Sequence, residues 1–204
     1  MGKEHGVFVL ASKIRTFVAI ELPENIRTDL RRLQHDFTSY RFGIRWVKPR
    51  NMHLTLKFLG DVDPVHVEAI GNVLAESVGQ TPVFELLPRG LGVFPNIRQP
   101  RILWTGIAGQ ADALRYLHRS VEIALDPLGF TADKRFFTGH LTIGRIKKRI
   151  DPKRLADALR IHQGFASDPF AVERMVLYKS DLKQNSPQYT KLREIRLRVH
   201  AKTT

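Results

Sequence analysis

Apolar residues recur along the chain at two spacings, one typical of helices and one typical of strands. Helical spacing predicts helices over residues 24–39, 64–78, 112–128 and 152–161. Runs rich in apolar, β-branched and aromatic residues predict strands over residues 15–20, 45–47, 53–60, 83–93, 101–107, 140–145, 170–178 and 189–199. Strands and helices are mixed along the chain, which predicts a fold that contains both.

The order of these segments repeats once, with an offset of about 87 residues. Four pairs of features share this offset: Thr16–Ile20 and Leu103–Ile107, His53 and His140, Asp63-Pro64 and Asp151-Pro152, and Pro82 and Pro169. The offset is longer than the period of about 20–50 residues that is typical of solenoid repeats. We therefore expect the two copies to pair about a pseudo-two-fold axis, which would bring their His-x-Thr strands together.

The first His-x-Thr strand covers residues 53–60, with the sequence HLTLKFLG. Successive side chains of a strand point to opposite faces. Strict alternation therefore predicts that His53, Thr55 and Lys57 share one face, and that Phe58 points into the core with the leucines. Lys57 becomes a candidate ligand for a substrate.

The second His-x-Thr strand covers residues 140–145, with the sequence HLTIGR. The same rule places His140 and Thr142 on one face and Arg145 off it, so the role of Arg145 stays open. One histidine on a strand is usually structural. Two at matched positions of a repeat, each followed by a matched threonine, favour a pair of histidines that face each other across one cleft.

Two histidines and two hydroxyl groups can supply acid–base catalysis. Because the pKa of an unperturbed histidine is about 6.5, one ring can accept a proton near neutral pH while the other donates one. Threonine hydroxyls and a lysine can hold the oxygens of a phosphoryl group. A 2′,3′-cyclic phosphate at the end of an RNA, which has a strained ring and a sugar oxygen as leaving group, suits such a site.

The composition narrows the choice of partner and excludes several kinds of chemistry. The chain has 33 Lys and Arg against 20 Asp and Glu, and this net charge of +13 favours an anionic partner. The absence of cysteine excludes disulfides, a thiol nucleophile and cysteine-ligated metals. Neither motif holds a carboxylate that would complete a metal site, and there is no P-loop or dinucleotide fingerprint. We expect no metal and no cofactor.

The motifs resemble those of a known family over about Arg15 to Leu197. The resemblance rests on residues 17–20 (FVAI), 51–60 (NMHLTLKFLG), 90–96 (GLGVFPN), 100–104 (PRILW), 128–130 (LGF), 140–145 (HLTIGR) and 177–180 (LYKS). The chain is similar to the 2H phosphoesterases, specifically the bacterial and archaeal RNA 2′,3′-cyclic phosphodiesterases, also called 2′-5′ RNA ligases. It departs from many members at Gly139, where they carry proline before the second histidine.

The resemblance implies an α+β fold, the LigT-like fold, with two pseudo-symmetric lobes. Each lobe is an antiparallel sheet with outer helices, and the lobes form a V-shaped central cleft. A single domain over residues 14–200, made of the two interleaved repeats, would follow an N-terminal extension over residues 1–13.

The resemblance also implies metal-free hydrolysis of an RNA 2′,3′-cyclic phosphodiester to a 2′-phosphomonoester, with 2′-5′ ligation as the reverse reaction. Matched by motif, His53 is the proton donor to the leaving 3′ oxygen and His140 is the proton acceptor that activates water. Thr55 and Thr142 bind the phosphate oxygens. Lys57 and Arg145 are further candidate ligands.

Two alternatives to this function stay open. The chain could bind RNA ends without turnover, or it could perform the same chemistry on a small cyclic nucleotide, an ADP-ribose cyclic phosphate or a 2′-5′ oligoadenylate. The strong positive charge favours polymeric RNA with a 2′,3′-cyclic phosphate end, tRNA fragments being one source. The basic tract Lys147–Arg149 is either a solvated surface or an RNA contact. We expect a cytoplasmic monomer. We expect no membrane contact, because no apolar run approaches the length of about 20 residues that spans a membrane.

Overall fold

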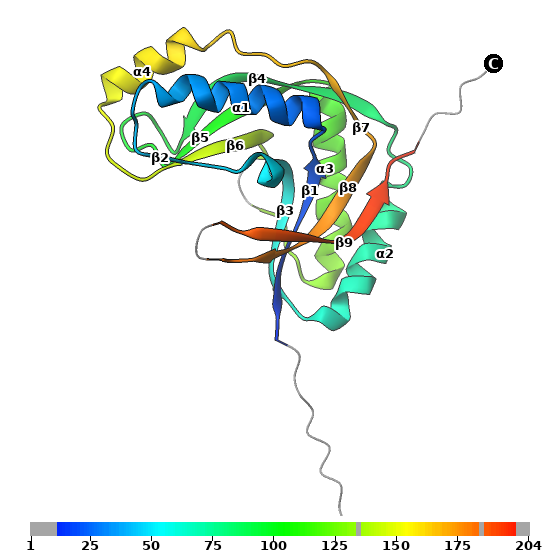
Figure 1. Cartoon of the computed structure of the whole chain (residues 1–204). Helices are drawn as coiled ribbons and strands as arrows, with labels where there is room; N and C mark the ends of the chain where they lie inside the picture. The colour runs from blue at the N-terminus through cyan, green and yellow to red at the C-terminus, as the bar shows by residue number, and fades with distance from the viewer. Residues whose placement is uncertain (1–11, 134–135, 184–185, 199–204) are drawn as a thin grey trace, which may run out of the picture.

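The computed structural model describes residues 12–133, 136–183 and 186–198. Its strands are β1 (Ile14–Glu21), β2 (Ile44–Trp46), β3 (His53–Val62), β4 (Phe84–Phe94), β5 (Ile102–Gly109), β6 (His140–Ile146), β7 (Phe170–Val172), β8 (Arg174–Asp181) and β9 (Gln188–Arg196). Its helices are α1 (Glu24–Thr38), α2 (Val67–Val78), α3 (Ala111–Leu125) and α4 (Pro152–Ile161), with short 3₁₀ turns at Pro49–Asn51, Pro64–His66 and Asp126–Leu128. The elements follow the order that the sequence predicts (Figure 1).

The described strands form a single antiparallel sheet that is made of two halves. The strand order is β7-β4-β5-β6-β3-β1-β8-β9, and β2 pairs with β6 outside this path. The two halves meet where β6 lies beside β3, and there only Leu54 and Leu141 are paired. The first residues of both His-x-Thr motifs therefore lie beside the seam between the halves. The predicted α+β fold with two antiparallel halves is confirmed, with the difference that the halves are continuous across this pair.

Each half of the sheet takes strands from both copies of the repeat. β4, from the first copy, pairs with β5 of the second, and β8, from the second copy, pairs with β1 of the first. The predicted strand over residues 170–178 is wrong in one respect, because the chain breaks at Glu173 into β7 and β8. β7 pairs with β4 in one half of the sheet and β8 pairs with β1 in the other, so the break is where the chain crosses between the halves.

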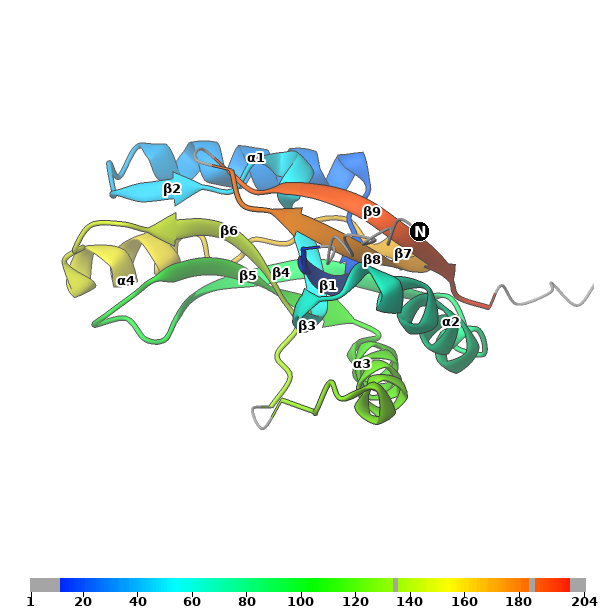
Figure 2. The same cartoon turned by 90° about the horizontal axis from the view of Figure 1, so that it is seen from below.

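The helices, like the strands, contact helices from the other copy of the repeat. α2 and α3 lie side by side (Figures 1 and 2), and the end of α1 meets the residue after α4, where the rings of Phe37 and His162 lie 4.8 Å apart between their centres. Each pair joins one helix from each copy. The Ser77 hydroxyl of α2 donates to the carbonyl oxygen of Ser120 in α3 at 3.2 Å, and the Tyr40 hydroxyl after α1 lies 3.3 Å from Nε2 of His162 after α4.

The core lies between these helices and the sheet, and it fixes the strands that carry the motifs. Leu54 and Leu141, the seam pair, are fully buried, as are Leu30 of α1 and Leu117 of α3. Gln34 of α1 donates through its amide to the carbonyl oxygen of Ile143 in β6 at 2.8 Å and to that of Val47 at 2.9 Å. The amide of Gln34 thus ties α1 to β6, the strand that carries the second motif.

Candidate active site

The two motif histidines begin their strands and are held in the same way. Nδ1 of His53 lies 2.8 Å from the carbonyl oxygen of Asn51, and Nδ1 of His140 lies 2.8 Å from the carbonyl oxygen of Thr138. Because a carbonyl can only accept, Nδ1 carries a proton and donates in both rings. Nε2 is left in each ring as the nitrogen that can exchange a proton with a ligand.

Both histidines line one cavity of about 340 Å³ at the seam of the sheet. Thr55 and Thr142 line the same cavity, and neither hydroxyl is hydrogen-bonded to another group in the described part of the chain. The structure therefore brings together the four residues that the two motifs predict. His53 and Thr55 lie on one half of the sheet and His140 and Thr142 on the other, as the repeat predicts.

A bulge in β3 changes the predicted face of Lys57. Val18 of β1 pairs with Lys57 while Ala19 pairs with Thr55, which leaves Leu56 without a partner across the ladder. An extra residue of this kind reverses the alternation beyond it. Leu56 and Lys57 are both buried, whereas Phe58 is 68% exposed and lines the cavity. The prediction that Lys57 shares the face of His53 is wrong, as is the placement of Phe58 in the core.

An equivalent bulge in β6 brings Arg145 into the cavity. Leu103 of β5 pairs with Gly144 while Trp104 pairs with Thr142, so that Ile143 is the extra residue. Arg145 is consequently exposed on the same face as His140 and lines the cavity, against the strict alternation expected from sequence. Arg145 and Phe58 occupy matched positions of the repeat, so the cavity is asymmetric at this pair.

Lys57 instead belongs to a buried ion pair behind the sheet. Its Nζ lies 2.5 Å from a carboxylate oxygen of Glu122 in α3 and donates to the carbonyl oxygen of Thr131 at 2.9 Å. The other carboxylate oxygen of Glu122 lies 3.5 Å from Nε2 of His118. Lys57 therefore connects β3 to α3 and to the segment that leads to His140, and it does not line the cavity.

Aromatic rings support both histidines from the neighbouring strands. The ring of Phe17 in β1 lies 4.8 Å from that of His53, and the ring of Trp104 in β5 lies 6.4 Å from that of His140, between ring centres. These two aromatics are themselves matched by the repeat offset, a signal present in the sequence. Trp104 lies over Gly92 of β4, where a Cβ atom would stand 2.2 Å from the indole. Only glycine leaves room for this ring.

The cavity is strongly cationic. Among the residues that the structure describes, four basic side chains line it, namely Arg15, Arg45, Lys48 and Arg145, and no carboxylate does. None of the four forms an ion pair within residues 12–133, 136–183 and 186–198. The charge is therefore available to an anion, and a phosphate group is the anion that such a set of cations and hydroxyls suits.

The electrostatics of the cavity act on His53 in particular. Burial lowers the pKa of His53 to about 4, opposed by the hydrogen bond to Asn51 and helped by the charges of Arg145 and His140. In the ligand-free protein His53 is therefore neutral at pH 7, with its Nε2 unprotonated. A bound anion would act in the opposite direction, since negative charge favours the imidazolium.

Comparison with known proteins matches most of the chain to one family. The family model described as LigT like Phosphoesterase matches residues 20–104 and 106–189. The chain belongs to this family.

The relatives of this LigT-like chain are named consistently. A protein of Methanothermobacter thermautotrophicus named RNA 2′,3′-cyclic phosphodiesterase is 33% identical over 185 residues, which cover 91% of this chain and all of the relative. A protein of Thermotoga maritima with the same name is 32% identical over 182 residues, which cover 89% of this chain and 94% of the relative.

Solved structures agree with the fold. A crystal structure of a Thermus thermophilus protein, 25% identical, superposes with a TM-score of 0.76 and covers 92% of this chain and all of that one. Escherichia coli LigT in apo form, 21% identical, superposes with a TM-score of 0.72 and covers 92% of this chain and 99% of its own. Another structure of that protein, 24% identical, is a complex with 3′-AMP, has a TM-score of 0.71 and covers 91% of this chain and 98% of its own.

Three features considered from the sequence, a basic tract, a metal site and a membrane span, do not contribute to the site in the described part of this LigT-like chain. The basic tract Lys147–Arg149 is exposed and does not line the cavity of the two histidines. Among the described residues, no cluster of three or more His, Cys, Asp or Glu side chains could hold a metal ion. No helix within the described ranges is long and apolar enough to cross a membrane.

Proposed function

We propose that this protein hydrolyses the 2′,3′-cyclic phosphodiester at the end of an RNA to a 2′-phosphomonoester. The observation that carries the proposal is the pair of histidines in one cationic cavity, each with Nδ1 tied to a carbonyl and Nε2 left available. The names of the relatives support the choice of substrate. The net charge of +13 favours an RNA chain over a small nucleotide.

The two histidines divide the proton transfers in this mechanism. Nε2 of His140 takes a proton from water, and the resulting hydroxide attacks the phosphorus atom. The bond from phosphorus to the 3′ oxygen breaks, and Nε2 of His53 gives its proton to that oxygen. The product keeps the 2′ ester, and each histidine ends in the protonation state with which the other began.

The remaining cavity residues stabilise the phosphate and hold the nucleotide. The hydroxyls of Thr55 and Thr142 and the guanidinium of Arg145 donate to the nonbridging oxygens, whose negative charge grows as water attacks. The exposed ring of Phe58 offers a face on which the terminal base can stack. In ligation a 5′-hydroxyl group of a second RNA takes the place of water, the bond from phosphorus to the 3′ oxygen breaks in the same way, and the product carries a 2′-5′ linkage.

The product of a single reaction tests this proposal. Incubation with an RNA that ends in a 2′,3′-cyclic phosphate is expected to yield a 2′-phosphate end, and EDTA is expected to leave the rate unchanged, because the proposed steps need only protein groups. Mass spectrometry and a 3′-specific phosphatase distinguish the two phosphate isomers. A 3′-phosphate product would contradict the proton assignments, and binding of the RNA end without turnover would indicate the binding module instead. Monomeric state, cytoplasmic location and the domain boundaries stay predictions.

The protonation of His53 gives a second test that needs no turnover. His53 must be charged to act as donor, yet burial lowers its pKa to about 4 in the free protein. We expect nuclear magnetic resonance titration to place its pKa near 4 in the free protein and markedly higher when inorganic phosphate fills the cavity, with His53→Gln used for assignment. If the pKa stays near 4 with phosphate bound, His53 is neutral at pH 7 and the donor and acceptor roles must be exchanged.

A further inference from the structure

A second cavity, of about 820 Å³, opens on the other side of His53. The two cavities share His53 and Tyr189 as a common wall, together with Asn51, Ser186 and Pro187. The rings of His53 and Tyr189 meet edge to face, with their centres 5.2 Å apart. A substrate held by His53 in the first cavity can therefore continue over this wall into the second.

The second cavity is lined by four cations, Arg27, Arg50, Lys183 and Lys191, and by one carboxylate, Glu21. The cations fall into two groups. Lys191 and Arg27 are ion-paired, whereas Arg50 and Lys183 are exposed and form no ion pair in the part of the chain that the structure describes. The unpaired cations are free to bind an anion.

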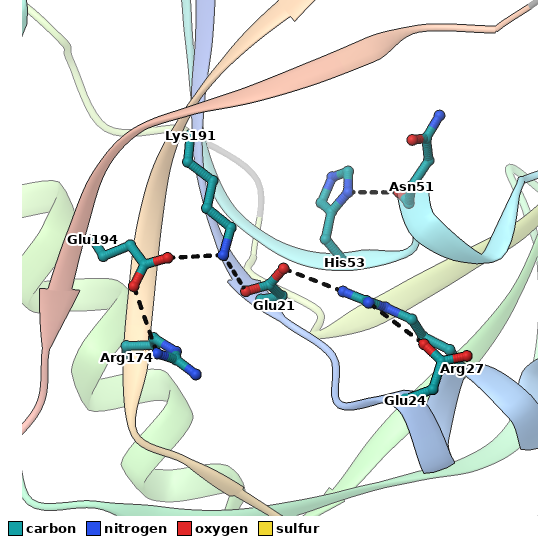
Figure 3. A network of polar contacts seen from close by, with 8 residues as sticks. All are labelled: Glu21, Glu24, Arg27, Asn51, His53, Arg174, Lys191 and Glu194. Atoms are coloured by element: carbon teal, nitrogen blue, oxygen red, sulfur yellow. Dashed lines mark hydrogen bonds and ion pairs between the residues drawn. The ribbon is translucent and has the colours of Figure 1, made fainter.

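The paired cations form a fixed network beside His53 (Figure 3). Nζ of Lys191 lies 2.8 Å from Glu21 and 2.7 Å from Glu194, and Arg27 lies 3.3 Å from the other oxygen of Glu21. Glu21 is the partner of His53 across the β1–β3 ladder, so the network is anchored next to that ring. It holds the wall of the cavity in place, and Arg50 and Lys183 add the net positive charge.

We infer that the second cavity binds the backbone phosphate on the 5′ side of the terminal nucleotide, so that the enzyme prefers RNA chains to mononucleotides. The inference rests on the proposed function. With the leaving 3′ oxygen at Nε2 of His53, the terminal ribose lies against the wall shared with the second cavity. The 5′ side of that ribose then leads away from the cyclic phosphate toward Arg50 and Lys183, where the next phosphate meets cations with no partner.

Substrates of different length test the inference. We expect the kcat/KM of a dinucleotide and a trinucleotide with a 2′,3′-cyclic end to exceed that of the corresponding mononucleoside 2′,3′-cyclic phosphate by about 10-fold or more, as a charge-assisted phosphate contact provides. In the double variant Arg50→Ala/Lys183→Ala this ratio is expected to fall to about 3-fold or less. Higher salt is expected to shrink the ratio in the unmodified protein.

A matched control removes two exposed cations outside both cavities, Arg32 of α1 and Lys153 of α4. The variant Arg32→Ala/Lys153→Ala is expected to keep the length ratio of the unmodified protein. Equal kcat/KM for all lengths would overturn the inference, as would an equal loss of the ratio in the control, because the effect would then be that of net charge alone. Loss of ligation without change in the hydrolysis ratio would also overturn it and would assign the cavity to the 5′-hydroxyl strand. Failure to turn over even the mononucleotide would instead contradict the proposed function.

Discussion

Replacement of either cavity histidine, His53→Ala or His140→Ala, is expected to lower kcat by about 10²–10⁴-fold, which is the usual contribution of a general acid or base. Both rings are half-buried at the start of a strand and project into the cavity, so that their removal leaves the core intact. Circular dichroism and thermal unfolding should therefore be close to those of the unmodified protein. His35→Ala, on the exposed face of α1, is the control that should retain activity.

The two variants should differ in how they respond to the leaving group. A cyclic substrate with sulfur in place of the 3′ oxygen needs less protonation, since a thiol has a pKa of about 8.5 and a sugar hydroxyl is far less acidic. This substrate is expected to restore much of the rate to His53→Ala and little to His140→Ala. Rescue of His140→Ala in place of His53→Ala would reverse the assignment of donor and acceptor, and near-normal kcat in either variant would remove that histidine from the mechanism.

The substitution Lys57→Met is expected to lower the free energy of unfolding by about 3–5 kcal/mol, because it leaves the Glu122 carboxylate buried without its cation. The side chains of both residues are at most 10% exposed, so that water cannot compensate the lost pair. The carbonyl oxygen of Thr131 loses its donor as well. Urea unfolding monitored by tryptophan fluorescence measures the change.

A double variant separates the charge from the packing at this position. In Lys57→Met/Glu122→Leu no carboxylate remains buried, and most of the lost stability is expected to return. The folded fraction of either variant should keep a KM within a few-fold of that of the unmodified protein, since Lys57 does not line the cavity. A stable Lys57→Met protein with a strongly raised KM would contradict the placement of Lys57 and restore it as a substrate ligand.

The repeat was sufficient to predict that the two histidines and two threonines line one cavity, and strand alternation was not sufficient to predict which residues lie beside them. The shared offset of His53 and His140 predicts that they meet, because duplicated units pair about an axis. Alternation failed at Lys57 and Arg145, since the extra residues Leu56 and Ile143 reverse the faces of the residues that follow them. No glycine or proline marks the bulge at Leu56. The repeat offset of 87 residues aligns Phe58 with Arg145. This alignment indicates that the two side chains take equivalent positions in their strands, and both line the cavity.

Long-range pairing accounts for the other difference from the sequence. Glu173 and Arg174 interrupt the apolar run at the point where the chain leaves β4 and joins β1, but two charged residues within a strand do not by themselves indicate a change of partner. The second cavity was also beyond sequence reasoning. Arg50 and Lys183 are far apart in the chain and come together only because the β8–β9 hairpin folds back beside β3, where the Asn51 amide donates to the carbonyl oxygen of Pro187 at 2.8 Å.

The exchange of strands between the two halves sets the order in which the protein can be completed during its synthesis. In the half that contains β4, β5 and β6, these three strands follow one another along the chain, and they are joined by β2, which is made earlier, and by the short β7. β1 is made long before β8, and it lacks its second partner until β8 has been made, about 160 residues later. Pairing of strands at such a separation is slow, because the entropy of closing a long loop is lost before the contacts between the strands form. A nascent chain therefore holds an unfinished cleft until β8 has been made.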